Sequence, residues 1–361
     1  MTQTDEDRNA EKSARTRSRD ALPPDPRLSG RRPAMTDVAT LAGVSHMTVS
    51  RVLNDPDTVT SRTRARVEAA IRELDYHPNY AARTLVTGRS KTLGVVALDS
   101  LLYGPASTLY GIELAARESE YRISIVSLRV PNRQSIADAI ERLRAQGVDG
   151  IVVIAPSVVA VRALPYVPRQ LPIVAAQGRL GGSVPGASVD QYTGARLAVE
   201  HLLKLGHRTV YHAAGPSEWF EANERERGWR ETLRNAGATI TPVLRGDWTP
   251  RAGYELGRKL TETKDLSAVF VANDEMALGM LRAFSEAGIG VPRDVSIVGF
   301  DDAPGAEFFS PPLTTVRQDF FELGRRTVTL LLENIDGRRQ EALPSVRPEL
   351  IIRQSTGAPK R

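Results

Sequence analysis

The spacing of apolar positions along this chain changes near residue 92. From there on, short runs rich in β-branched residues alternate with longer segments whose apolar residues recur every three or four positions. The runs are LGVVAL, ISIVSL, GIVVIA, PIVAA, RTVYHAA, SAVFVA and VSIVGF. The longer segments predict helices near 107–121, 135–147, 192–206, 223–237, 251–263, 274–288 and 320–335. Strands that alternate with helices predict parallel sheets covered by helices on both faces.

This second part of the chain is too long for one sheet of that kind. The segment GGSVPGASVD, residues 181–190, is rich in glycine and predicts a joint between two lobes. The expected fold class is therefore α/β, with two lobes built on parallel sheets. Ligands of doubly wound sheets bind beyond the carboxyl ends of the strands. The residues that directly follow each apolar run are consequently candidates for a binding site.

A smaller helical unit is predicted around the stretch DVATLAGVSHMTVSRVLN. Its first helix begins at a cap, Thr36, and its second covers 46–53 behind the cap Ser45. A third helix covers 61–74 behind the cap Thr60. The inward stripes of the three helices are Val38, Leu41 and Ala42, then Val49, Val52 and Leu53, then Val67, Ala70, Ile71 and Leu74.

The first two of these helices are joined by a tight turn at Gly43, where a side chain would obstruct the backbone. The outer face of the second helix carries polar and long side chains, namely His46, Met47, Ser50, Arg51 and Asn54. Three short helices around one small core form a helix-turn-helix module, whose second helix enters the major groove of DNA. This pattern favours a DNA-binding unit near the start of the chain.

Charge and composition agree with that interpretation and exclude several others. Of the net charge of +5 in 361 residues, residues 31–91 carry +4, from ten Lys and Arg against six Asp and Glu. A basic patch on a small module favours an anionic polymer as partner, although a solvated surface could give the same count. The chain has no cysteine, which excludes disulfides and thiolate chemistry and permits a cytoplasmic location. No apolar stretch is long enough to cross a membrane, and residues 1–30 lack the apolar core of a signal peptide.

The motif VSHMTVSRVLN, followed by TVTSRTRARVEAAIRELDYHPN, closely resembles the headpiece of the lactose-repressor/galactose-repressor family. The similarity extends over about 33–356. It implies a three-helix headpiece, a hinge helix and a two-lobed effector domain similar to periplasmic sugar-binding proteins. The boundaries that we expect are a disordered tail over 1–32, the headpiece over 33–78, a hinge helix and linker over 79–91, the effector domain over 92–356 and a short tail over 357–361.

The resemblance also implies which residues touch DNA. His46, Met47 and Arg51 occupy the positions that read bases. In the hinge segment HPNYAARTLVTG, Leu85 matches a residue that wedges into the minor groove, and such a wedge kinks the duplex. The alternative is that Leu85 packs into the headpiece core. The remaining predicted DNA contacts are Thr36, Ser45, Thr48, Ser50, Asn54, Thr60, Thr63, Tyr76, Asn79 and Ala82.

The three base-reading positions differ in what their chemistry predicts. Arg51 offers a bidentate fork to guanine, worth roughly 1–3 kcal/mol of discrimination. Its alternative role is an ion pair with a carboxylate. His46 can donate or accept a hydrogen bond, so its target base stays open. Met47 cannot donate one, which leaves a thymine methyl contact or a passive position. The operator sequence does not follow from these residues.

Candidate ligand residues follow the apolar runs, as the topology rule requires. Arg225, Asn273 and Asp301 match family positions that hydrogen-bond a ligand, and Trp248 and Phe320 match those that line its apolar side. Planar polar groups beside aromatic rings suit a neutral sugar. The other wall is expected from LLYGPAST, which includes Tyr103, and the further predicted contacts are Gln177, Trp219 and Glu221. Because Trp219 and Glu221 extend the site, a di- or oligosaccharide is favoured over a monosaccharide.

Each of these residues also has a structural alternative. Trp248 could be a core aromatic, and Asp301 could cap a strand end. Trp229 is expected in the core, Asp302 in a local pair, and His207 in the ordering of a turn. No metal site and no cofactor is predicted.

Two other protein classes compete with a regulator. A glycosidase could use Asp301 and Glu221 as its carboxylates, but no other catalytic motif accompanies them. A transport receptor would share the two-lobed fold, but a DNA-binding headpiece would serve no purpose in such a protein. Within the regulator class, the effector could instead be a nucleobase or a phosphorylated metabolite. The expected partners are pseudo-palindromic double-stranded operator DNA, a small effector and a second copy of the chain in a homodimer.

Overall fold

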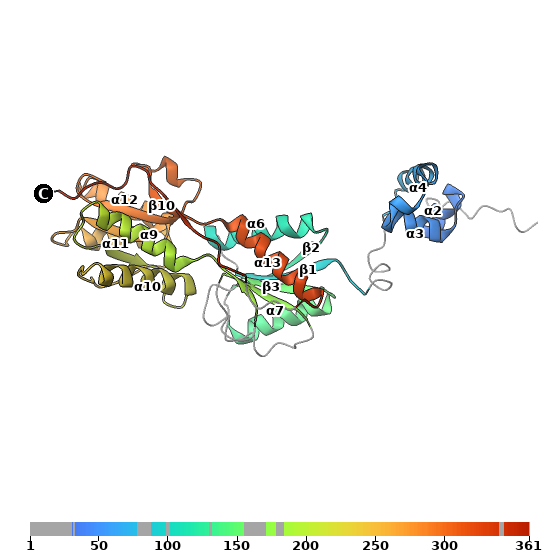
Figure 1. Cartoon of the computed structure of the whole chain (residues 1–361), viewed down its shortest axis with the longest axis horizontal. Helices are drawn as coiled ribbons and strands as arrows, with labels where there is room; N and C mark the ends of the chain where they lie inside the picture. Colours follow the sequence, from blue (N-terminus) through green and yellow to red (C-terminus); the bar gives the residue numbers. More distant parts are fainter. Residues whose placement is uncertain are drawn as a thin grey trace, which may run out of the picture. The chain divides into compact units, whose positions relative to one another are not determined.

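The computed structural model describes residues 31, 33–77, 88–98, 102–129, 132–154, 171–177, 184–338 and 343–360. The chain forms two compact units, Met1–Val86 and Thr87–Arg361 (Figure 1). The helical headpiece belongs to the first, and the two sheets of the effector domain belong to the second. The tail predicted over 1–32, apart from Arg31, and the predicted hinge contacts Asn79, Ala82 and Leu85 lie outside the described residues.

The headpiece consists of three α-helices and one 3₁₀ turn around an apolar core. Its elements are α2 (Met35–Ala42), α3 (His46–Asn54), η1 (Pro56–Thr58) and α4 (Ser61–Glu73). One valine from each α-helix is fully buried at the centre: Val38, Val49 and Val67. Leu41, expected on the inner stripe, is instead half-exposed.

The helix starts were predicted correctly for two of the three helices. Ser45 accepts a hydrogen bond from the Thr48 amide at 3.1 Å, and Thr60 caps α4 in the same way. The prediction for Thr36 is wrong, because α2 begins at Met35 and Thr36 lies exposed in its first turn. The start of α2 is held by the Asp37 carboxylate, which accepts a hydrogen bond from the Ala34 amide at 2.7 Å. A carboxylate in the first turn also complements the helix dipole.

Gly43 is required at the turn between α2 and α3 for two reasons. Its φ of 59° lies in the left-handed region, and a Cβ there would come within 2.8 Å of Arg66 Nη2. Arg66, from α4, donates hydrogen bonds to the carbonyls of Ala42 at 2.5 Å and Gly43 at 3.1 Å. The arginine therefore satisfies the open end of α2 and fixes the angle at which α3 leaves it.

Lobe 1 of the effector domain is a five-stranded parallel sheet. Its strands in spatial order are β2 (Arg122–Leu128), β1 (Thr92–Leu98), β3 (Gly150–Ile154), β4 (Ile173–Ala176) and β5 (Gly186–Ala187). One face packs against α6 (Tyr103–Glu118) and α13 (Phe320–Ile335), and the other packs against α7 (Arg133–Ala145). Burial on both faces explains why β1 and β3 are continuously apolar.

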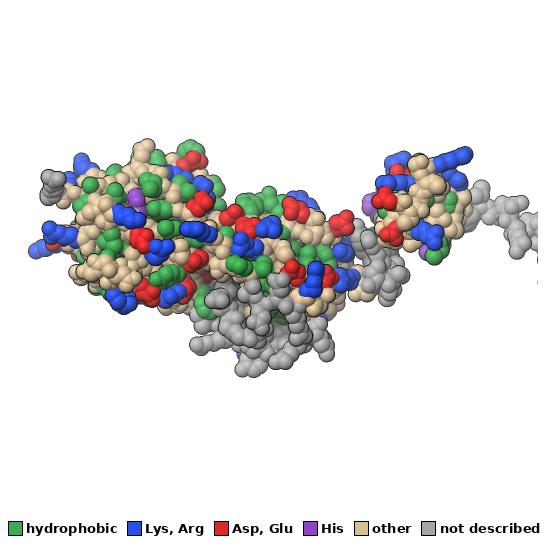
Figure 2. All heavy atoms as spheres, viewed as in Figure 1, with side chains coloured by type: hydrophobic (Ala, Val, Ile, Leu, Met, Phe, Trp, Pro, Cys, Tyr) green, Lys and Arg blue, Asp and Glu red, His purple; other side chains and the backbone are tan. Residues whose placement is uncertain are grey.

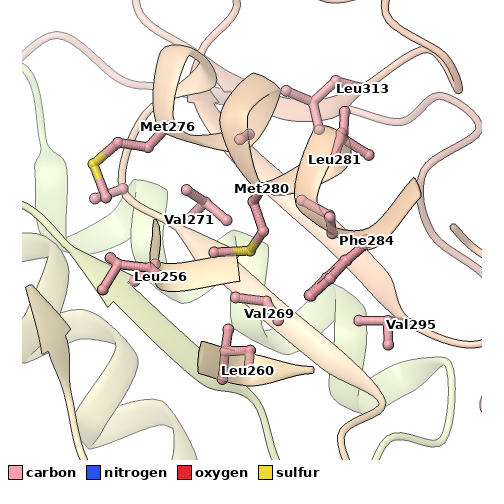
Figure 3. Close-up of a cluster of buried hydrophobic side chains, with 14 of the residues drawn as sticks. Leu256, Leu260, Val269, Val271, Met276, Met280, Leu281, Phe284, Val295 and Leu313 are labelled. Carbon is pink, nitrogen blue, oxygen red and sulfur yellow. The ribbon is translucent and has the colours of Figure 1, made fainter. Parts of the chain in front are cut away.

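Lobe 2 is a six-stranded sheet with one antiparallel edge strand. Its strands in spatial order are β11 (Glu349–Ile351), β10 (Thr314–Arg317), β9 (Ser296–Asp301), β8 (Ala268–Val271), β6 (Tyr211–Ala214) and β7 (Leu244–Arg245). Helices α9 (Gln191–Lys204) and α10 (Phe220–Asn235) cover one face. Helices α11 (Pro250–Leu260) and α12 (Asp274–Glu286) cover the other, where Leu256, Met280 and Phe284 interlock over β8 (Figure 3).

The two lobes are not two consecutive stretches of chain. The chain passes into lobe 2 at 188–190, within the joint predicted over 181–190. It returns after β10, because α13 packs on lobe 1, and it crosses again before β11, which pairs with β10 (Figure 1). The apolar pattern missed β5, β7, β10 and β11, since these strands are short and β10 and β11 are partly polar.

The predicted C-terminal tail over 357–361 is packed on lobe 2 as far as Lys360. The Gly357 carbonyl is hydrogen-bonded to His207 Nε2 at 3.0 Å, and its amide donates to Ser296 Oγ at 3.0 Å. Lys360 pairs with Asp294. The expected boundary at 356 therefore falls inside a packed segment.

Candidate functional site

The outer face of α3 is open, as the sequence predicts. His46, Met47 and Arg51 are exposed, with Met47 at 64%. Arg51 forms no ion pair with any carboxylate in the part of the chain that the structure describes. Other arginines on the headpiece surface are Arg62, Arg64, Arg66 and Arg72 (Figure 2). This unit presents exposed cations and a bare helix face.

Other predicted DNA-contact residues also hold the headpiece together. The hydroxyls of Ser45 and Thr48 are 2.9 Å apart, and Thr60 donates to Thr63 at 3.0 Å. Asn54 donates to the Ser50 carbonyl at 2.9 Å. These side chains are pre-oriented at the surface by their neighbours.

Tyr76 has a role that the sequence analysis did not assign to it. It is only 6% exposed and packs in the headpiece core with Val38 and Val67. Its ring therefore stabilises the headpiece, and any contact with DNA would be limited to the edge of the side chain.

A single pocket between the two lobes contains all nine of the predicted ligand residues. It is partly open to solvent, and its empty volume, including that open space, is about 410 Å³. Its lining consists of Leu102, Tyr103, Gly104, Pro105, Gln177, Trp219, Glu221, Arg225, Trp248, Asn273, Asp301, Gln318 and Phe320. We call it the interlobe pocket. The sequence analysis missed Gln318, although it lies only two residues before the predicted ligand residue Phe320.

The topology positions the lobe 2 residues at the carboxyl ends of strands. Asp301 ends β9, and Asn273 follows β8 as the N-cap of α12. The Asn273 side chain accepts from the Met276 amide and donates to the Trp248 carbonyl, both at 3.0 Å. Trp248, Asp301 and Gln177 have positive φ angles of 77°, 113° and 63°. Such uncommon backbone conformations concentrate at functional sites.

Arg225 is held by a closed ring of buried polar side chains. Its Nε donates to Gln191 at 2.8 Å, Gln191 donates to Gln318 at 2.7 Å, and Gln318 donates to Asp301 at 2.6 Å. The ring closes where Arg225 Nη2 lies 3.7 Å from Asp301 Oδ1. Arg225 also donates to the Ala272 carbonyl. Gln191 directly follows one interlobe crossing and Gln318 lies at the start of another, so the ring joins two crossings to two predicted ligand residues.

Burial shifts the pKa values of both carboxyl groups in the pocket. Desolvation raises the pKa of Asp301 to about 6, against the opposing effect of Arg225 and the Gln318 hydrogen bond. Desolvation raises the pKa of Glu221 to about 8, and neither of its carboxyl oxygens has a hydrogen-bond partner. The Oε1 of Gln177 and the Nε1 of Trp248 are likewise buried without partners. Buried polar atoms without partners are costly, so this pocket is built for a polar ligand.

Aromatic rings form the apolar walls of the pocket. Trp219 and Trp248 meet edge to face, with ring centroids 5.4 Å apart. Tyr103 and Phe320 meet in the same way at 5.6 Å. Trp248 fits only because residue 215 is glycine, where a Cβ would lie 2.2 Å from the indole. Trp248 also belongs to the lobe 2 core, which is its structural alternative, while its predicted contact with a ligand stays a prediction.

Several residues have the structural roles that the sequence analysis preferred. Trp229 is fully buried and donates to the Val210 carbonyl at 2.8 Å. Asp302 pairs with Arg317 and Arg353, both at 2.7 Å, and does not line the pocket. His207 is hydrogen-bonded to Ser267 at 3.0 Å, which orders its turn.

Among the described residues there is neither a candidate metal site nor a helix that could span a membrane. No group of three or more His, Asp or Glu side chains there is arranged to hold a metal ion. None of the helices described has both the length and the apolar character needed to cross a membrane.

Comparison with family models matches both parts of the chain. Residues 34–79 match the model of bacterial regulatory proteins of the lacI family. Residues 199–356 match that of the periplasmic binding protein-like domain. These matches correspond to the headpiece and to most of lobe 2.

Curated relatives align over nearly their full length. The transcriptional regulator CelR of Thermobifida fusca is 36% identical over 90% of this chain and 98% of its own. The lactose operon repressor of Escherichia coli is 33% identical over 90% of each chain. The transcriptional repressor PurR of Haemophilus influenzae is 33% identical over 88% of this chain and 97% of its own.

Solved structures agree with these alignments. The Lac repressor dimer bound to operator and the anti-inducer ONPF is 31% identical and covers 91% of this chain and 100% of that chain, with a TM-score of 0.81. The complex of CelR with cellobiose is 32% identical and covers 90% of this chain and 100% of that chain, with a TM-score of 0.68. A headpiece with a bare recognition helix, a two-lobed pocket and these relatives lead to one assignment. The chain belongs to the lacI family of bacterial regulatory proteins and is a DNA-binding transcriptional repressor.

Proposed function

We propose that this repressor is released from its operator by a neutral sugar that binds in the interlobe pocket. The observation that carries the proposal is the set of buried polar atoms without partners. Three of them are oxygens, on Glu221 and Gln177, and one is the indole nitrogen of Trp248. Sugar hydroxyls can donate to the oxygens and accept from the indole, and the aromatic walls can cover the C–H faces of a pyranose.

The charges of the pocket disfavour a phosphorylated ligand. Arg225 is the single cationic side chain among the described lining residues. It is already engaged by Gln191, the Ala272 carbonyl and Asp301, and its guanidinium stacks 3.8 Å from the Phe300 ring centroid. A phosphate group in this pocket would face two carboxyl groups and no uncommitted cation.

A nucleobase that acts as corepressor is the second candidate. The flat indole of Trp248 and the ring of Phe320 could stack on a planar base. A base has its N–H donors only along the edge of a flat ring, however, whereas the hydroxyls of a sugar point outward all around the ring and can reach more of the Glu221 and Gln177 oxygens. The polarity of the response separates the two ligands, since a sugar is expected to weaken operator binding and a nucleobase to strengthen it.

For the headpiece, we propose that Arg51, His46 and Met47 read base edges while Ser45, Thr48, Ser50, Asn54, Thr60 and Thr63 contact phosphates. The exposure of α3 and the freedom of Arg51 from described carboxylates support this assignment. Two copies of the chain would present two headpieces to half-sites related by a twofold axis. The similarity to an operator-bound Lac repressor dimer supports this arrangement.

Communication between ligand and hinge is proposed to run through α13. This helix begins at Phe320 in the pocket, and Asp336 directly follows its last residue, Ile335. Asp336 pairs at 2.9 Å with Arg89, which lies in the segment leading from the hinge into β1. At 1.5 Å per residue the helix is about 24 Å long and rigid enough to transmit a shift. The same segment is also attached to lobe 1 through Asp149, which accepts from Ser90 and Lys91.

The test combines a thermal-shift screen with operator binding. Mono-, di- and trisaccharides, purine and pyrimidine bases, and sugar phosphates are each added to the full-length chain, and any ligand that raises Tm is added to a gel-shift titration with genomic operator fragments. We expect a neutral sugar to raise Tm and weaken operator binding. A base or a phosphorylated compound that raises Tm, while no neutral sugar does, would overturn the proposal.

A further inference from the structure

The interlobe pocket adjoins a larger cavity that the proposed function does not use. This second chamber is partly open to solvent, and its empty volume, including that open space, is about 1140 Å³. Its described lining consists of Gln177, Ser188, Val189, Asp190, Gln191, Tyr192, Phe220, Glu221, Glu224, Arg227 and Ser345. Gln177 and Glu221 line both cavities, so the two spaces meet at these side chains.

The shared wall carries the same oxygens that lack partners. Glu221 is 7% exposed and Gln177 is 8% exposed. Both carboxyl oxygens of Glu221 and the Oε1 of Gln177 are buried without a hydrogen-bond partner. The Gln177 amide nitrogen is anchored by donating to Thr108 Oγ1 at 2.9 Å, which turns the oxygen away from that anchor. A ligand with hydroxyls at this junction would satisfy atoms that are costly to bury alone.

The second chamber has the surface of a carbohydrate subsite. Tyr192 and Phe220 provide aromatic area, and Ser188 and Ser345 provide hydroxyls that lie 3.3 Å apart. Its one described cation, Arg227, pairs with Glu224 at 2.6 Å and stacks 4.3 Å from the Tyr192 ring centroid. The described part of the lining therefore has no excess of positive charge that would favour a phosphate or a nucleotide.

We propose that the effector is a neutral oligosaccharide of three or more rings, whose chain passes between Glu221 and Gln177 into the second chamber. This inference rests on the proposed function, because it extends the sugar from the interlobe pocket. The first rings lie against Trp248 and Phe320, and the next ring lies against Tyr192. Glu221 and Gln177 accept hydroxyl hydrogens from the two rings that flank the junction.

The experiment is a calorimetric titration of the full-length chain with sugars of increasing length. The probes are glucose, cellobiose, cellotriose and cellotetraose, and the matching series from maltose to maltotetraose. We expect one series to bind, with the trisaccharide at least ~10-fold tighter than the disaccharide, a step of about 1.4 kcal/mol. Trisaccharide affinity equal to that of the disaccharide would overturn the inference.

Substitutions in the second chamber test whether this chamber is the source of the tighter binding of the trisaccharide. Ser345→Trp fills the chamber and Tyr192→Ala removes its ring, while neither residue lines the interlobe pocket. Both are expected to erase the advantage of the trisaccharide and to leave disaccharide affinity unchanged. Tyr192→Phe is the matched control, because it keeps the ring and removes only the hydroxyl that donates to Glu231. A trisaccharide advantage that survives Ser345→Trp and Tyr192→Ala would contradict the assignment.

Failure of the proposed function gives a different result from failure of this inference. If no sugar of any length binds while operator binding is intact, the sugar-responsive repressor itself is contradicted. If cellobiose or maltose binds and longer sugars bind no more tightly, only the proposed role of the second chamber is contradicted.

Discussion

The two lobes of the effector domain have similar architectures but contribute differently to the interlobe pocket. Lobe 2 supplies Trp219, Glu221, Arg225, Trp248, Asn273 and Asp301, and lobe 1 supplies Tyr103, Gln177 and Phe320. The lobe 2 groups are held by hydrogen bonds that exist without ligand, such as those of Asn273 and Arg225. The lobe 1 groups mostly provide aromatic cover. In the proposed function, this difference means that lobe 2 recognises the ligand and lobe 1 closes over it.

This division has a physical basis. A polar group that is already fixed loses little conformational freedom when the ligand binds, so recognition belongs on the lobe with the complete hydrogen-bond ring. The aromatic side chains of lobe 1 contribute to the binding free energy only when the lobes enclose the ligand, because only then is apolar surface removed from water. Lobe 1 is also the lobe to which the hinge-proximal residues Arg89 and Ser90 are bonded. In the proposed function, closure of lobe 1 therefore acts on residues 88–91, the segment that leads toward the predicted hinge.

The largest expected effect comes from breaking recognition in lobe 2. Asp301→Ala removes the carboxylate that faces Arg225 and accepts from Gln318. We expect effector affinity to fall ~100-fold, since losing hydrogen bonds to a buried charge costs about 3 kcal/mol. Operator affinity without effector should remain. Asp302→Ala is the control, because its pairs with Arg317 and Arg353 lie outside the pocket. If Asp301→Ala keeps its response to the effector, the proposed role of lobe 2 in ligand recognition is contradicted.

A smaller loss is expected when the cover of lobe 1 is removed. Phe320 is 3% exposed and meets Tyr103, while its neighbour Phe321 is 55% exposed and lies outside the pocket. Phe320→Ala should weaken sugar binding ~10-fold to 30-fold, the equivalent of about 2 kcal/mol of lost apolar contact. Phe321→Ala should leave sugar affinity at the wild-type value. Equal effects of the two substitutions in a calorimetric titration would argue against a covering role for Phe320.

The link from lobe 1 to the hinge can be changed without touching the pocket. Asp336→Arg breaks the pair with Arg89. Sugar affinity should stay within about twofold, while the drop in operator affinity caused by sugar shrinks ~5-fold, because coupling and binding are separate free energies. The double variant Arg89→Asp with Asp336→Arg should restore the response. Normal induction by the single variant in a gel-shift titration would exclude α13 as the route.

The smallest effect is a pH dependence of stability that arises from Glu221. Burial raises the pKa of this carboxyl from its ordinary value of 4.5 to about 8 in the folded chain. The contribution to stability is therefore complete below pH 4.5, declines as the pH rises, and is lost once the pH passes about 8. Glu221→Gln removes this dependence. Its Tm relative to wild type should rise by a few degrees between pH 5 and pH 8, and a constant difference in scanning calorimetry would mean that Glu221 does not hold its proton.

Much of the fold was predictable because it depends on local patterns. The 3.6-residue period placed α9 to α13 within a few residues, and the caps Ser45 and Thr60 placed two headpiece helices. Asn273 and Asp301 were found because polar residues after buried strands must gather at one edge of a parallel sheet. Thr36 was misplaced because a threonine before an apolar stripe resembles a cap, and the true start depends on Asp37.

The sequence by itself determined the two architectures and the exposed outer face of α3, which follow from local periodicity, while strand ends and the family resemblance pointed to nine of the residues that line the pocket. Only the tertiary structure decided that α13 returns to lobe 1, that Gln191 and Gln318 join Arg225 to Asp301, and that a second chamber opens beside Glu221. Those features are contacts between residues far apart in the chain, such as Gln191 and Gln318, which are 127 positions apart. Such contacts depend on how the chain crosses between lobes, which no local pattern of side chains specifies.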